Sequence, residues 1–136
     1  MVKKSNRREN RVIRRGSRDR IIIPFYFEKR IVGWTARTIT VDKKPKYINE
    51  QQPGFVYGLD NQTFDKQFAI LCEGPIDAIH VGGCAIGGSE VNDTQALLLN
   101  RLTKDIVVVP DRDSAGKKLV ERAIDLGWSV SLPDWD

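Results

Sequence analysis

The sequence has few of the residues that bind soft metals or form covalent cross-links. Its 136 residues include two cysteines, one histidine and one methionine. Cys72 and Cys84 both lie in apolar segments and lack the close spacing of a zinc motif. This predicts two reduced thiols in the core rather than a disulfide or a zinc pair. Since His80 is the single histidine, the sequence argues against a histidine-based metal centre or nucleophile site.

Long hydrophobic runs are also missing. None approaches the roughly 18 apolar residues that a membrane-spanning helix needs. The N-terminus is charged and has no apolar stretch of a secretory signal behind it. The chain is therefore predicted to be soluble and cytoplasmic, without a membrane partner, and its length fits one domain around a single core.

Charge, by contrast, is abundant and unevenly distributed. Residues 1–50 hold 15 Lys and Arg against 5 Asp and Glu, whereas residues 51–136 hold 7 against 13. A basic half joined to an acidic half indicates a polyanion-binding region beside a metal-binding one, and an uneven but merely solvated surface is the alternative. Residues 1–19 are dense in Arg and Lys without apolar periodicity, which predicts a flexible arm. That arm would be either a nucleic-acid-binding segment or a solubilising tail.

The segment after the arm has the pattern of β-structure. The apolar run 21–27 predicts a strand that Pro24 would place at a sheet edge or a bulge. Residues 30–40 predict its antiparallel partner, with a turn at Glu28 and Lys29. Residues 42–66 are rich in Pro, Gly, Asn and Gln, which predicts a long loop with short ordered pieces. Residues 20–66 are therefore expected to form a small, basic, β-rich N-terminal subdomain.

Residues 67–136 alternate between strand and helix patterns and are expected to form a second unit. The predicted strands are 68–72, 84–86, 106–109 and 128–132. The predicted helices begin at Pro75, at Asp93 or Thr94, and at Ser114, and the last is ended by Gly127. This alternation implies right-handed crossovers and an α/β fold with a parallel sheet of about four strands.

Acidic residues directly follow two of these predicted strands. Glu73 follows the first, and Asp111 and Asp113 follow the third. If the two strands are neighbours, the carboxylates converge at the sheet edge where open parallel sheets form their sites. A divalent cation would relieve their mutual repulsion, and oxygen-only ligands suit Mg²⁺ or Mn²⁺. The alternative is that Glu73 and Asp113 each cap the helix that follows.

Two motifs about forty residues apart resemble the signature motifs of the Toprim family, which includes primases, topoisomerases, recombination mediators and small nucleases. They are Glu73-Gly-Pro-Ile-Asp77-Ala and Asp111-Arg-Asp113-Ser-Ala-Gly116. Four blocks in the N-terminal half resemble the series that precedes Toprim in bacterial and phage DNA primases. These are Arg20-Ile-Ile-Ile-Pro-Phe, Val-Gly-Trp-Thr-Ala-Arg37, Pro-Lys46-Tyr-Ile-Asn49 and Tyr57-Gly-Leu. The residues around the second acidic motif and at the C-terminal end look like phage versions.

The resemblance implies a Toprim, Rossmann-like domain and the catalytic core of a DNA primase. Such an enzyme is a nucleotidyltransferase that makes short RNA primers from NTPs on a single-stranded DNA template. By this resemblance Glu73, Asp111 and Asp113 would hold Mg²⁺ or Mn²⁺, although Glu73 could instead be the general base. Asp77 would be a supporting acid or a helix-dipole partner. The expected nucleotide- or nucleic-acid-binding residues are Lys46, Arg37, Arg20 and Asn49, with ordinary surface charge as the alternative for the cations.

The sequence also departs from the family pattern. A zinc-ribbon module, a helicase region and a complete third acidic motif are missing, so a zinc-ribbon module and a replicative helicase are expected as separate partners. The chain would then be a weak catalyst alone, a fragment, or one half of a split primase, in a bacterial host's cytoplasm if a phage encodes it. Two alternative functions stay open: a Toprim nuclease, and a non-catalytic nucleic-acid-binding Toprim domain.

Overall fold

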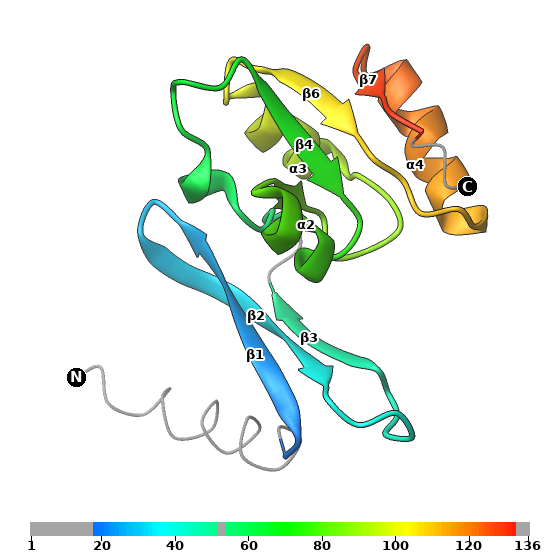
Figure 1. Cartoon of the computed structure of the whole chain (residues 1–136). Helices are drawn as coiled ribbons and strands as arrows, with labels where there is room; N and C mark the ends of the chain where they lie inside the picture. Colours follow the sequence, from blue (N-terminus) through cyan, green and yellow to red (C-terminus); the bar gives the residue numbers. More distant parts are fainter. Residues whose placement is uncertain (1–17, 52–53, 133–136) are drawn as a thin grey trace.

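The computed structural model describes residues 18–51 and 54–132, which form a small antiparallel sheet and a parallel sheet flanked by helices (Figure 1). The predicted arm 1–19 lies almost wholly outside the described residues. The two-sheet arrangement confirms the predicted α/β fold with a β-rich N-terminal part.

The small sheet has the strand order β1-β2-β3. Strands β1 (Arg20–Phe27) and β2 (Arg30–Thr38) form the expected hairpin, and Pro24 lies in the edge strand beside a bulge, as predicted. Strand β3 (Tyr47–Gln51) was not predicted, because it lies within the segment interpreted as a long loop. Its five residues include Asn and Glu, which are poor strand formers, so pairing with β2 determines its conformation.

The hairpin turn is stabilised by a residue far away in the sequence. Glu28 and Lys29 both have positive φ angles, 50° and 63°, which residues other than glycine rarely adopt. The Asp60 carboxylate accepts their backbone N–H groups at 3.0 and 2.7 Å. Because Asp60 belongs to the 3₁₀ helix η1 (Leu59–Asn61), these bonds also tie the small sheet to the segment that leads into the parallel sheet.

The parallel sheet has the strand order β5-β4-β6-β7, and every neighbouring pair is parallel, which confirms the predicted four-stranded sheet. Its strands are β4 (Phe68–Cys72), β5 (Cys84–Ala85), β6 (Asp105–Val108) and β7 (Ser129–Val130). The helices are α2 (Pro75–Val81), α3 (Asp93–Asn100) and α4 (Ser114–Asp125). In the part of the chain that the structure describes, no helix is long and apolar enough to cross a membrane.

The helix ends follow local sequence signals. Asn92 and Gln95 form a capping box at the start of α3, with the Gln95 N–H donating to Asn92 Oδ1 at 2.9 Å. Helix α4 ends at Asp125 and is followed by Gly127 in the left-handed region, with φ of 73°. Glycine adopts this conformation without strain, which is why the predicted stop signal is correct.

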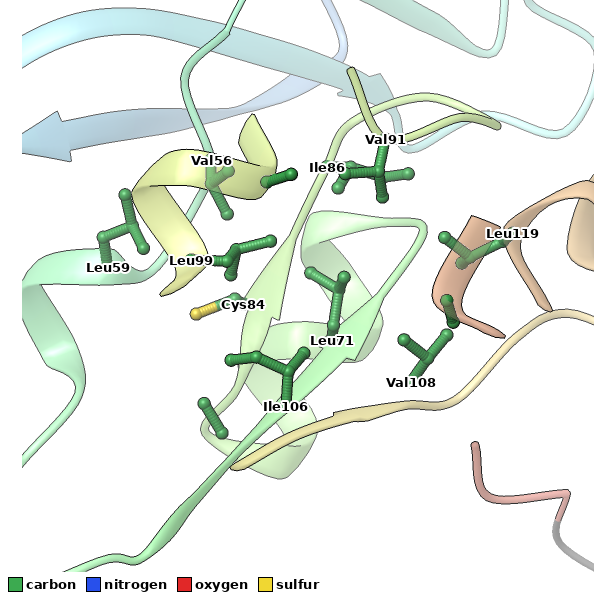
Figure 2. Close-up of a cluster of buried hydrophobic side chains, with 13 residues drawn as sticks. Val56, Leu59, Leu71, Cys84, Ile86, Val91, Leu99, Ile106, Val108 and Leu119 are labelled. Atoms are coloured by element: carbon green, nitrogen blue, oxygen red, sulfur yellow. The ribbon is translucent and has the colours of Figure 1, made fainter. Parts of the chain in front are cut away.

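The main core lies between the parallel sheet and its helices (Figure 2). Leu71 and Val108, on adjacent strands, are fully buried together with Leu99 of α3 and Leu119 of α4. Cys72 and Cys84 are free and buried, as predicted. Burial raises the pKa of the Cys72 thiol to about 11 and that of Cys84 to about 12, so both stay protonated at neutral pH.

The segment between the sheets fixes one against the other. Tyr57 pairs with Ala85 at the edge strand β5 through two backbone hydrogen bonds of 2.8 and 3.1 Å. The Tyr57 ring packs edge-on against Phe25 of β1, with 5.4 Å between centroids. The small sheet is thereby held beside the carboxyl ends of the parallel strands, where a cleft opens.

Candidate functional site

The strand order brings two of the predicted acids to one point. Strands β4 and β6 are parallel neighbours, and the chain leaves β4 toward β5 on one side and β6 toward β7 on the other. A switch of this kind leaves a crevice at the carboxyl ends of the two strands. Glu73 follows β4 and Asp111 lies just beyond β6, so both are at this crevice, as the sequence predicted.

Glu73 and Asp111 are in direct contact. The Asp111 backbone N–H donates to Glu73 Oε1 at 3.1 Å. Burial raises the pKa of the Glu73 carboxyl, and the negative charges of Asp111, Asp113 and Asp77 raise it further, whereas the Asp111 N–H opposes them. The pKa of Asp111 is also raised, by burial and by Asp77 and Asp113, and Lys46 lowers it in part. The crevice is thus a site of accumulated negative charge.

Asp113 has a different local position. Its Oδ1 accepts the Gly116 N–H at 2.9 Å, which makes it the N-cap of α4. This is the capping alternative noted from the sequence, and Asp113 does not line the cleft. Glu73, by contrast, does not cap α2, whose N-cap is Gly74. A metal-binding role for Asp113 therefore stays a prediction.

Gly116 is required because α4 begins directly against the Asp111 backbone. A Cβ atom at Gly116 would lie 1.8 Å from the Asp111 carbonyl oxygen, which is backbone and cannot rotate away. The small residue at the end of the second acidic motif therefore lets Asp111 approach the helix.

Gly116→Ala should destabilise the protein by about 3 kcal/mol or more, through overpacking against backbone. Alanine inside a helix is otherwise favoured over glycine by about 1 kcal/mol, so the sign of the change is diagnostic. Gly88→Ala is the matched control, since a Cβ there would meet nothing within 4 Å. Thermal or urea unfolding of both variants measures the difference. Equal stability of the Gly116→Ala variant and the wild type would show that this close approach does not exist.

A cleft of about 430 Å³ lies between the acids and the small sheet. Its acidic wall comes from the ends of the parallel strands, and its cationic wall comes from β2, β3 and Lys46, which directly precedes β3. The acidic wall is lined by Glu73, Gly74, Pro75, Asp77, Gly87, Gly88 and Asp111; the opposite wall is lined by Thr35, Arg37, Lys46, Tyr47 and Asn49. Six of the predicted site residues are thus brought together on the two walls: Glu73, Asp77 and Asp111 on one, and Arg37, Lys46 and Asn49 on the other.

The cationic wall follows the two-residue period of paired strands. Arg37 lies opposite Tyr47 and Thr35 lies opposite Asn49 in the register of β2 and β3, so these four share one face. The Arg37 guanidinium lies 5.5 Å and the Lys46 ammonium 5.9 Å from the centre of the Tyr47 ring. Two cations around one ring give this wall positive charge with an aromatic surface between them.

Arg20 is placed differently from the prediction. Its guanidinium donates to the carbonyl of Pro45 at 2.6 Å and to those of Ala36 and Lys46 at 3.3 Å each. It does not line the cleft. Arg20 therefore holds the backbone beside Lys46, and a direct contact with nucleic acid stays a prediction.

The acidic wall is chemically suited to a hard divalent cation. Among residues 18–51 and 54–132, no three His, Cys, Asp or Glu side chains form a cluster that could hold a metal ion by themselves. Mg²⁺, however, is commonly bound by one or two carboxylates and completes its shell with waters and substrate phosphates. Glu73 and Asp111 fit this requirement, because both carry carboxylate oxygens. Burial and the neighbouring acids raise the pKa of each carboxyl, so a bound cation would relieve the repulsion between the charged forms.

Glu73→Gln should stabilise the metal-free protein at neutral pH. Folding raises the pKa of the Glu73 carboxyl, so this group stabilises the folded state below the ordinary carboxyl pKa. That stabilisation is lost as the pH rises through the raised pKa of the folded state. The melting temperature of the variant should exceed that of the wild type at pH 7 and approach it near pH 4. Mg²⁺ at about 100 times its Kd should stabilise the wild type by about 2.7 kcal/mol, and the variant less.

Asp105→Asn is the matched control for this measurement, because Asp105 is exposed at the opposite end of β6. It should change neither the pH profile nor the response to Mg²⁺. A Glu73→Gln variant that is less stable than the wild type at pH 7 would contradict the electrostatic account of the crevice.

Sequence reasoning left several residues that line the cleft out of the predicted site, among them Gly87, Gly88 and Thr35. Gly87 and Gly88 follow β5, and their position after a predicted strand was an available signal. Thr35 was also missed, although it lies two residues before Arg37 and so belongs to the same strand face.

Comparisons with known proteins agree with this arrangement. Residues 70–134 match a family model described as Toprim-like. The DNA primase of Aquifex aeolicus (strain VF5) is 31% identical over 129 residues, covering 83% of this chain and 26% of that protein. A solved DNA primase domain from Pseudomonas aeruginosa has a TM-score of 0.71 at 26% identity, covering 87% of this chain and 44% of that one.

A further solved structure shares the fold, a DnaG primase catalytic domain bound to single-stranded DNA. It has a TM-score of 0.68 at 23% identity and covers 87% of this chain and 45% of that one. The chain thus spans about a quarter of the curated relative and less than half of either solved chain.

Proposed function

Because this chain is a relative of the bacterial DNA primases and carries a Toprim-like domain, we propose that its cleft catalyses nucleotidyl transfer, joining ribonucleotides into short RNA primers on single-stranded DNA. The observation that carries this proposal is that the acidic wall lies opposite the cationic, aromatic wall across one cleft. A nucleotide triphosphate with a divalent cation has the charges that such a cleft would bind.

In the proposed reaction a 3′-hydroxyl attacks the α-phosphorus of an incoming NTP, a new phosphodiester bond forms, and pyrophosphate leaves with the bond to the β-phosphate broken. Arg37 and Lys46 would bind phosphate oxygens, Arg37 as a planar fork and Lys46 as a compact charge. Glu73 would either be a ligand or accept the proton of the attacking hydroxyl, a task that its raised pKa favours.

The proposed cofactor is Mg²⁺ or Mn²⁺ on Glu73 and Asp111. When bound, such an ion would lower the pKa of a coordinated hydroxyl and stabilise charge on the attacked phosphate. Asp77 and Asp113 would add negative charge around the ligands, since both raise the pKa of Glu73 and Asp111.

The proposed template is single-stranded DNA, which the related DnaG catalytic domain binds in its solved complex. The excess of Lys and Arg in residues 1–50 supports this assignment. We also propose a zinc-ribbon module and a replicative helicase as partners, and the cytoplasm as the place of action. The similarity reported is to bacterial primases, so an origin in a phage stays a prediction.

The experiment that tests the function incubates the chain with single-stranded template, NTPs and Mg²⁺ or Mn²⁺, with and without a zinc-ribbon module, and separates the products by length. Short RNA would support the proposal. Cut DNA without RNA would identify a nuclease, and DNA binding without either product would identify a non-catalytic binding domain. The Glu73→Gln variant, which should remain folded, is the control for a contaminating polymerase.

A further inference from the structure

The proposed reaction assigns no role to one cross-strand pair on the cationic wall. Thr35 and Asn49 are direct partners in the register of β2 and β3, and both line the cleft. Thr35 is 2% exposed, whereas Asn49 is exposed. A buried hydroxyl costs free energy unless it is hydrogen-bonded, so the partner of Thr35 is informative.

The Thr35 hydroxyl donates to Asn49 Oδ1. The Ile48 carbonyl oxygen also lies within reach, at 3.4 Å. A hydroxyl has a single proton to donate, so the nearer acceptor, Asn49 Oδ1, takes it. The buried threonine therefore anchors one branch of the Asn49 carboxamide at the base of the wall.

Because Thr35 holds the Asn49 carboxamide on one side, the atom on the other side, which can contact a ligand, is also determined. A carboxamide has one acceptor oxygen and two donors on its nitrogen. With Oδ1 turned toward Thr35, the exposed branch is Nδ2, a donor. Across the same sheet face, the next pair along is Arg37 with Tyr47, so this donor lies beside cationic groups.

We propose that Thr35 is a positioning residue, which holds Asn49 so that its Nδ2 donates to a phosphate oxygen of the bound nucleotide. The inference rests on the proposed nucleotide function. A phosphate oxygen fits because it accepts hydrogen bonds without donating them, and because Lys46 and Arg37 line the same wall. An unanchored asparagine could turn its oxygen outward, which would repel that phosphate.

The test is a double-mutant cycle on the affinity for ATP in the presence of Mg²⁺, measured by calorimetry on the full chain. Thr35→Val, which keeps the shape and removes the hydroxyl, should weaken ATP binding about fivefold, and Asn49→Ala about tenfold. In the double variant the loss should be no greater than in Asn49→Ala alone, because Thr35 acts through Asn49. Thr35→Ser, which keeps the hydroxyl, should bind as the wild type does.

A merely structural role for Thr35 gives different results. The losses of Thr35→Val and Asn49→Ala would then multiply in the double variant, or Thr35→Ser would lose as much as Thr35→Val, and either outcome would overturn the inference. Thermal unfolding of each variant monitors the fold. Asn49→Asp, an exposed change, tests the donor without touching the core: it should bind ATP more weakly than Asn49→Ala, and wild-type affinity would contradict a donor at this position.

The outcomes also separate this inference from the proposed function. If the wild-type chain binds ATP and the cycle is additive, only the role of Thr35 is wrong. If the wild-type chain binds no ATP at all, the inference and the nucleotide function both fail.

Discussion

The Asp111→Asn variant should lose about 10³-fold or more of Mg²⁺-dependent primer synthesis, which corresponds to about 4 kcal/mol of barrier. Asp111 lies at the switch point between β4 and β6, where its carboxylate is part of the acidic wall of the cleft. An amide oxygen at this position would be a neutral and weaker ligand for a hard cation. The backbone N–H that Asp111 donates to Glu73 is unaffected by the substitution.

The same variant should remain folded. Asp111 raises the pKa of Glu73, so removing its charge relieves repulsion in the crevice, and the metal-free variant should be at least as stable as the wild type at pH 7. Loss of synthesis with retained stability separates a direct role from unfolding. Asp125→Asn, at the end of α4, is the control with the same change in net charge and should keep full activity. If the Asp111→Asn variant synthesised primers at a rate within about tenfold of the wild type, Asp111 would not be a metal ligand.

Lys46→Ala should reduce the rate of synthesis about 10²- to 10³-fold, or about 2–4 kcal/mol of barrier. Lys46 lines the cleft opposite the acids and lowers the pKa of Asp111 by its charge. It is therefore near enough to meet a phosphate beside the reacting centre, where negative charge develops. Removing it should also let the pKa of Asp111 rise further, which weakens the affinity for a cation at lower pH.

Binding of long single-stranded DNA should respond much less to this substitution, because contacts with a DNA backbone are spread over many cations. A fall of only a few fold is expected from a filter-binding or anisotropy titration. Lys118→Ala, an exposed change on α4, is the control and should alter neither quantity. If Lys46→Ala synthesises primers at the wild-type rate, Lys46 is an ordinary surface charge.

Much of the fold could be predicted because its signals are local. The alternation of strands and helices, the start of α3 at Asp93 and the stop at Gly127 each depend on residues near one another in the sequence. Strand β3 could not be predicted in the same way. Its conformation depends on pairing with β2, because Asn49 and Glu50 are poor strand formers and the residues around the strand have the composition of a loop.

The candidate site was predictable where it depends on strand ends and was not where it depends on long-range contacts. Glu73 and Asp111 follow parallel strands, so their convergence required only that β4 and β6 be neighbours. The position of Arg20 depends on carbonyls at residues 36, 45 and 46, which no local pattern reveals. Whether Asp113 faced a cation or capped α4 could not be decided from the sequence, because carboxylates at strand ends suit both tasks.

In the proposed function, both walls of the cleft act on one nucleotide and its cation. The most direct measurement is paramagnetic broadening of backbone amide NMR signals by Mn²⁺, recorded with ATP present. Strong broadening is expected at Glu73, Gly87 and Asp111 on the acidic wall together with Lys46 and Asn49 on the other, and clearly weaker broadening at Asp105 at the far end of β6. Broadening confined to residues outside the cleft, or absent from Lys46 and Asn49, would contradict the proposed function.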